Sequence, residues 1–254
     1  MELRADKFMK IKVINPNTSA SMTEQIGATA RSIASRETEI VAVNPDMGPV
    51  SIEGFYDEAL SVIGVLDEIR KGEAQGTDGY VIACFGDPGL YAARELARGP
   101  VIGIAEAAMR TAVLLSSEFS IVTTLARTRI IAQHLVDRYG MNQFCRNIRS
   151  IDLPVLSIET DTKAQTAILE ECYRAIKVDQ VGAIVLGCGG MAHLAVQLTQ
   201  ELNVPVIDGV SAAVKLAEAV ISLKLKTSKA GSYAFPIAKP YTGIFQSFSS
   251  SENP

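Results

Sequence analysis

The chain has 254 residues, of which 48% are hydrophobic and 20% are charged, and its formal net charge is −4 at pH 7. This length and apolar content can bury a large core in one domain or two. A mildly acidic chain without a basic run is unsuited to nucleic acid. It also lacks an apolar run of about 18 residues and a signal peptide, so it is predicted to be cytoplasmic and to make no membrane contact.

Short apolar, β-branched runs alternate along the chain with longer helical patterns. Strands are expected at 11–14, 38–43, 80–84, 101–104, 119–123, 183–186 and 204–207. Helices are expected at 18–33, 58–71, 89–97, 106–116, 128–139, 162–177, 191–202 and 210–223. Continuous apolar runs are typical of strands buried on both faces, and the alternation with helices predicts parallel sheets with right-handed crossovers.

Three stretches of the first half have counterparts about a hundred residues later. Pro100-Val-Ile-Gly-Ile-Ala-Glu-Ala-Ala108 resembles Pro205-Val-Ile-Asp-Gly-Val-Ser-Ala-Ala213, Cys84 corresponds to Cys188, and the segment 13–18 parallels 121–124. We therefore expect an α/β fold of two pseudo-symmetric Rossmann-like lobes, with parallel sheets and the active site in the cleft between them. The helix after each Pro-Val-Ile strand should lead into the other lobe. Lobe one is then 1–107 plus 210–254, and lobe two is 108–209.

The loop Asn15-Pro-Asn-Thr-Ser19 follows the first strand and precedes a helix, which Thr18 or Ser19 can cap. Its counterpart in lobe two is Thr123-Thr124. Together the two loops offer Asn15, Thr123 and Thr124 to a polar ligand between the lobes, although helix capping explains the first loop equally well. Ser51 begins the stretch Ser51-Ile-Glu-Gly54, which falls where a loop covering the substrate is expected.

Cys84 and Cys188 each end an apolar run and precede a glycine-containing turn. Parallel strands place their carboxyl ends at the edge where open α/β sheets build their sites. A helix N-terminus after each turn would lower the pKa of the thiol, whereas the alternative is a buried cysteine without a chemical role. The repeated placement in both lobes favours a chemical role.

The turns after the two cysteines are Phe85-Gly86-Asp87 and Gly189-Gly190. Their backbone N–H groups can stabilise negative charge on a carbonyl oxygen, or they form ordinary turns. Asp87 either orients a neighbouring group or begins the turn. The glycines match no nucleotide-binding pattern, so no cofactor is expected.

The other cysteines and the histidines show no pattern of a site. Cys172 has the spacing of a core residue on a helix, and Cys145 is expected in a connecting segment. His193 is expected on a helix face. With two histidines and no zinc-type cysteine spacing, no metal site is expected.

Two thiols facing one pocket suit racemisation by two bases. A thiolate removes a proton from a carbon next to a carbonyl, and a thiol on the opposite face returns one. Neighbouring N–H groups would stabilise the enolate that forms between the two steps.

From about Ile11 to about Phe245 the chain resembles the aspartate/glutamate/hydantoin racemase superfamily, and within it the hydantoin and allantoin branches. Both cysteine motifs, Ala83-Cys-Phe-Gly-Asp-Pro-Gly-Leu90 and Leu186-Gly-Cys-Gly-Gly-Met191, contribute to the resemblance, with the segments 13–19, 51–54, 103–107, 122–125 and 205–209. The resemblance implies a cofactor-independent enzyme in which Cys84 and Cys188 are the two bases. It implies substrate contacts from Asn15, from the turn after each cysteine, and from Thr123 or Thr124.

The residues after the cysteines bear on the substrate. Amino-acid racemases of the superfamily carry Cys-Asn-Thr and Cys-Thr-His, where this chain has Cys84-Phe-Gly and Cys188-Gly-Gly. Small, uncharged turns suit a flat neutral ring, so a 5-substituted hydantoin is expected as the small-molecule substrate. Allantoin is favoured over amino-acid-derived hydantoins, and an enzyme acting on it would belong to purine catabolism.

Two other functions are compatible with a two-lobed α/β chain. Maleate isomerisation and arylmalonate decarboxylation are other reactions of the superfamily, and the decarboxylation would need only one cysteine. A two-lobe binding protein would not need thiols at both strand ends. We expect a homo-oligomer, although no pattern in the sequence identifies the residues of an interface. The Ser-rich segment 246–254 is expected to be disordered.

Overall fold

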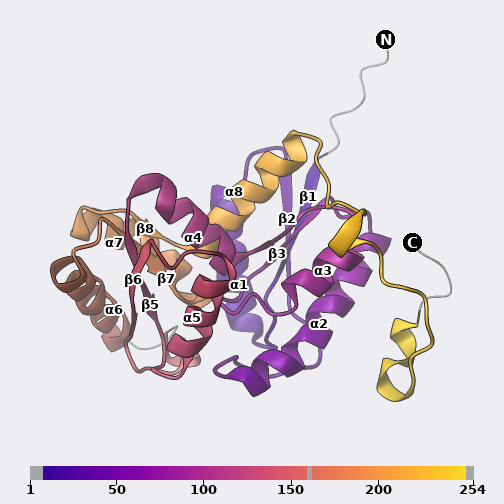
Figure 1. Cartoon of the computed structure of the whole chain (residues 1–254), viewed down its shortest axis with the longest axis horizontal. Helices are drawn as coiled ribbons and strands as arrows, with labels where there is room; N and C mark the ends of the chain where they lie inside the picture. Colours follow the sequence, from indigo (N-terminus) through magenta and orange to yellow (C-terminus); the bar gives the residue numbers. More distant parts are fainter. Residues whose placement is uncertain (1–7, 159–161, 250–254) are drawn as a thin grey trace, which may run out of the picture.

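The computed structural model describes residues 8–158 and 162–249. Figure 1 shows two α/β halves side by side, each built on a four-stranded parallel sheet. The strand order is β2-β1-β3-β4 in the first half and β6-β5-β7-β8 in the second. The strands are β1 (Met9–Ile14), β2 (Thr38–Val43), β3 (Gly79–Ile82), β4 (Val101–Gly103), β5 (Phe119–Thr123), β6 (Cys145–Ser150), β7 (Ala183–Leu186) and β8 (Val206–Ile207). The shared order confirms the two-lobed α/β fold with parallel sheets.

The helices follow the predicted ones with shifts of a few residues at their ends. In the first half they are α1 (Ala20–Ile33), α2 (Phe55–Ala74), α3 (Leu90–Leu96) and α4 (Ile104–Leu115). In the second half they are α5 (Thr128–Arg138), α6 (Thr162–Arg174), α7 (Ala195–Leu202) and α8 (Gly209–Ser222). Short turns of other helix types are η1 (Val155–Ile158), η2 (Ala175–Asp179, a π-helix), η3 (Gly189–Leu194), η4 (Gly231–Tyr233) and η5 (Gly243–Phe248).

The last helix of each half packs on the sheet of the other half. Helix α4 begins directly after β4 but contacts β7 and β8, whereas α8 follows β8 and contacts β3 and β4. The two helices also contact each other. This exchange is the arrangement expected from the repeat, and the lobe boundaries at 107 and 210 stay a prediction.

The central strands have the composition that burial on both faces requires. All four residues of β3 and all four residues of β7 are buried. Helices cover both faces of such a strand, so an alternating polar residue would lie in the core. Strand β3 ends at Ile82 rather than at residue 84, so Cys84 lies in the turn beyond the strand.

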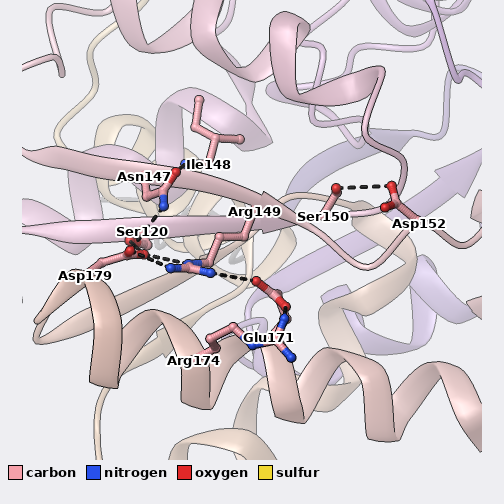
Figure 2. A network of polar contacts seen from close by, with 9 residues as sticks. All are labelled: Ser120, Asn147, Ile148, Arg149, Ser150, Asp152, Glu171, Arg174 and Asp179. Atoms are coloured by element: carbon pink, nitrogen blue, oxygen red, sulfur yellow. Dashed lines mark hydrogen bonds and ion pairs between the residues drawn. The ribbon is translucent and has the colours of Figure 1, made fainter.

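Sequence analysis missed β6, because its sequence Cys-Arg-Asn-Ile-Arg-Ser is mostly polar. It is an edge strand, and Figure 2 shows its side chains in a polar network with α6 and η2. Arg149 donates hydrogen bonds to both carboxylate oxygens of Asp179, at 2.7 and 2.6 Å, and to Glu171 at 2.8 Å. The network replaces apolar packing on this side of the strand. Cys145 therefore begins a strand and does not lie in a connecting segment.

The C-terminal segment returns to the first half after α8, as Figure 1 shows in yellow. Turn η4 contacts α3, and the Phe248 ring of η5 lies 4.8 Å from the Arg70 guanidinium. Residues 246–248, predicted to be disordered, thus belong to a 3-10 turn, and residues 250–254 lie outside the described residues. No helix within the described ranges is long and apolar enough to cross a membrane.

Candidate active site

A pocket lies between the two lobes, at the carboxyl ends of their central strands. Lobe one lines it with Asn15, Asn17, Met22, Ile52, Glu58, Ala83, Cys84, Phe85 and Gly86. Lobe two lines it with Thr123, Thr124, Thr128, Ile131, Val155, Gly187, Cys188 and Gly189. The pocket thus brings together both predicted cysteines, both polar loops and most of the two turns.

Cys84 and Cys188 occupy equivalent positions, two residues beyond β3 and β7. The backbone N–H before each cysteine still donates to the neighbouring central strand, in both lobes at 2.8 Å. The carbonyl of each cysteine accepts a hydrogen bond from the N–H three residues later, at 3.0 and 3.1 Å. The same local geometry therefore presents a half-buried thiol from each lobe to one pocket.

The pKa of Cys84 differs from the expectation. Burial raises it to about 12, although a hydrogen bond from the Gly86 backbone N–H lowers it. The charges of Cys188, Asp87 and Glu58 raise it further. The expected lowering by a helix N-terminus is therefore outweighed by desolvation, which disfavours the charged form of an acid.

The two cysteine turns touch each other through backbone atoms. A side-chain carbon at Gly189 would stand 2.8 Å from the carbonyl oxygen of Ala83, the residue before Cys84. Such a contact is too close for any residue with a Cβ, so this approach requires glycine. The contact fixes the position of one thiol-bearing turn against the other.

Asn15 and Thr123 follow β1 and β5 and are held in place by hydrogen bonds. Asn15 Nδ2 donates to Asn17 Oδ1 at 2.8 Å and to Thr23 Oγ1 at 3.0 Å. Thr123 Oγ1 donates to the Gly187 carbonyl at 3.1 Å and lies 3.0 Å from Thr128 Oγ1. Asn17 and Thr128 were not predicted as site residues, although Asn17 belongs to the loop 15–19, which was predicted to contact a ligand. Ser19 caps α1, as predicted, by accepting from the Met22 N–H.

Asp87 is 1% exposed and does not line the pocket. Its carboxylate accepts from the backbone N–H groups of Ala105 and Glu106 at 3.0 and 2.9 Å, and from the Tyr139 hydroxyl at 2.7 Å. Burial raises the pKa of Asp87 to about 6 against the opposing effect of these hydrogen bonds. This position does not support the expected substrate contact. Asp87 instead connects the Cys84 turn to α4 and to Tyr139, which follows α5.

Two other expected contacts lie beside the pocket wall rather than on it. Ser51 and Gly190 do not line the pocket, whereas their neighbours Ile52 and Gly189 do. The stretch 51–54 therefore reaches the site, as expected, but through an apolar side chain. Cys172 is fully buried, as predicted for a core residue. His193 is exposed, as predicted for a residue on a helix face.

Glu58, in the first turn of α2, is a pocket residue that sequence reasoning missed. Burial raises its pKa, while the positive charges of Arg138 and His134 act in the opposite direction. The sequence shows Glu58 only as an acidic residue near a helix N-terminus, a position with an ordinary structural explanation. Within the described residues, no group of three or more His, Cys, Asp or Glu side chains is arranged to hold a metal ion.

Known proteins resemble this chain over nearly its whole length. The family model "Asp/Glu/Hydantoin racemase" matches residues 11–217. A hydantoin racemase of Pseudomonas sp. strain NS671 is 51% identical over 94% of this chain and 97% of its own length. The solved structure of allantoin racemase from Klebsiella pneumoniae is 61% identical, covers 95% of this chain and 99% of that one, and has a TM-score of 0.94. Allantoin racemase from Pseudomonas fluorescens is 41% identical, covers 92% of this chain and 100% of that one, and has a TM-score of 0.89.

The two-lobed fold and these relatives place the protein among the isomerases, as a racemase. The chain belongs to the Asp/Glu/hydantoin racemase family, as the resemblance of its cysteine motifs predicted.

Proposed function

We propose that the protein racemises allantoin by proton transfer between Cys84, the ring stereocentre and Cys188. The observation that carries this proposal is the presence of one thiol from each lobe on the wall of a single pocket. The 61% identity to the Klebsiella pneumoniae allantoin racemase supports allantoin as the substrate.

The proposed reaction needs one thiolate and one thiol at the same time. The thiolate takes the proton from the C–H at the stereocentre, and the electron pair moves into the adjacent carbonyl to give an enolate. The second thiol gives its proton to the opposite face of the carbon, and its own sulfur becomes the thiolate. Each charge raises the cost of a second one nearby, so the pair holds a single negative charge before and after the step.

Activity should rise with pH between pH 6 and pH 9. A pKa raised to about 12 means that Cys84 is almost entirely protonated in this range. Each pH unit then increases its thiolate population about tenfold, and kcat/KM should increase by up to that factor. Initial rates of loss of optical rotation, corrected for the uncatalysed reaction, measure the profile. A rate that is constant or falls across the range would contradict a thiolate base of raised pKa.

The substrate proposal is tested by polarimetry with single enantiomers of allantoin and of 5-benzylhydantoin, without added metal or cofactor. We expect both enantiomers of allantoin to lose rotation, with a kcat/KM at least about tenfold above that for the benzyl compound. In heavy water the product should carry deuterium at the stereocentre. If neither compound is racemised, the proposed function is wrong.

A second candidate is racemisation of 5-monosubstituted hydantoins derived from amino acids. The 51% identity to the hydantoin racemase of Pseudomonas sp. favours it. The same chemistry applies, because the stereocentre again lies next to a ring carbonyl. A benzylhydantoin rate above the allantoin rate would select this candidate.

With allantoin as substrate, the enzyme would act in purine catabolism, where it would supply one enantiomer to the next enzyme. We propose that it acts in the cytoplasm. We also propose that it assembles as a homo-oligomer, which light scattering of the purified protein measures directly.

A further inference from the structure

The Glu58 carboxylate lies beside the Cys84 thiol at the pocket wall. A side-chain carbon placed on Gly86 would stand 3.8 Å from Glu58 Cδ, 3.9 Å from Glu58 Oε2 and 3.9 Å from Cys84 Sγ. Gly86 has no such carbon, so the space between carboxylate and thiol is left to a ligand. Both side chains line the same pocket.

Burial raises the pKa of Glu58, the charges of Arg138 and His134 lower it, and no described residue forms a hydrogen bond with its carboxylate. Arg138 and His134, which supply those charges, are exposed on α5. By contrast, Glu53 of the same region accepts from the Val155 N–H at 2.9 Å, and Asp57 accepts from the Glu53 N–H at 3.0 Å. Glu58 is thus the acid of this segment whose acceptor oxygens face the pocket.

A carboxylate at this place favours one kind of substrate substituent. Its oxygens accept hydrogen bonds from N–H groups, which hydantoin rings and their amide or ureido substituents carry. A second carboxylate on the substrate would be repelled, and more strongly in a partly desolvated pocket than in water. No described Lys, Arg or His side chain lines the pocket, and Arg138 and His134, whose charges lower the pKa of Glu58, lie outside its lining.

We propose that Glu58 is the specificity-determining residue that selects neutral, N–H-bearing substituents at the stereocentre and excludes acidic ones. This inference rests on the proposed racemisation of hydantoins. On this inference, Glu58 discriminates between substrates by the charge of the substituent and not by its size.

The experiment compares two hydantoins of nearly equal shape, one with a 2-carbamoylethyl and one with a 2-carboxyethyl substituent, at pH 8. The wild type should racemise the carbamoyl compound with a kcat/KM at least about tenfold higher. Glu58→Gln should bring this ratio close to one, mainly by improving the KM for the carboxy compound. Glu58→Asp should keep the preference, because it keeps the charge.

The control is Asp67→Asn, which removes one negative charge from the same helix at a half-exposed position paired with Lys71. It should leave the ratio unchanged. Glu58→Met provides a second neutral variant should Glu58→Gln fold poorly, which circular dichroism reports. If the neutral variants racemise the carbamoyl compound and keep the wild-type preference, the inference is overturned while the racemase function stands. If the wild type racemises allantoin but neither test compound, the inference is overturned, and if it does not racemise allantoin either, the proposed function itself fails.

Discussion

Replacing either Cys84 or Cys188 with serine should reduce kcat/KM for racemisation by about 10²- to 10⁴-fold. A hydroxyl is a far weaker acid than a thiol, so serine can act neither as the base nor as the opposed proton donor. The two substitutions remove opposite halves of one proton transfer, so we expect losses of similar size. Polarimetry on each enantiomer of allantoin measures them.

Deuterium exchange should separate the two variants. With one thiol left, the remaining base can still remove and return a proton on its own face, so only one enantiomer should exchange its C–H in heavy water. Cys84→Ser and Cys188→Ser should favour opposite enantiomers. The control is Cys145→Ser, since Cys145 is a half-buried thiol at the start of β6 and does not line the pocket. Full activity in both Cys84→Ser and Cys188→Ser would contradict the two-thiol mechanism.

Replacing Asp87 with alanine should lower the free energy of unfolding by about 3 kcal/mol or more. The substitution leaves the Ala105 and Glu106 N–H groups and the Tyr139 hydroxyl without their buried acceptor. It also opens a cavity beneath the Cys84 turn. Urea unfolding followed by circular dichroism measures the loss.

Asp152→Ala is the matched control for this loss. Asp152 also has a positive φ, 56° against 45° for Asp87, so alanine meets a similar backbone penalty at both positions. Its exposed carboxylate accepts from the Ala126 N–H at 2.7 Å. We expect a loss of about 1 kcal/mol there. Equal losses in the two variants would show that backbone conformation, and not the buried acceptor, accounts for the Asp87 effect.

The features that sequence predicted best are those encoded by adjacent residues. Central strands such as β3 and β7 are continuous apolar runs, and the repeat around Cys84 and Cys188 placed the two thiols at equivalent strand ends. The edge strand β6 was missed because hydrogen bonds to Asp179 and Glu171, distant in sequence, compensate for its polar residues.

The site was less predictable where it depends on packing between elements. Glu58 reaches the pocket only because α2 lies against the Cys84 turn, and no local pattern encodes that contact. Asp87 lies in the turn after Cys84, where a residue that binds the ligand is expected. Its carboxylate instead accepts hydrogen bonds from α4 and from Tyr139. The pKa of Cys84 is raised by burial, which a single sequence does not display.

The exchange of α4 and α8 between the two sheets has a consequence for synthesis of the chain. The first sheet is complete by residue 103, but the helix that covers β3 and β4 spans Gly209–Ser222. A ribosome must therefore translate most of the second half before the first can cover the face of its sheet on which α8 packs. The nascent first half should expose apolar surface during that interval. A chaperone would therefore find the largest apolar binding surface on the chain at this stage of synthesis.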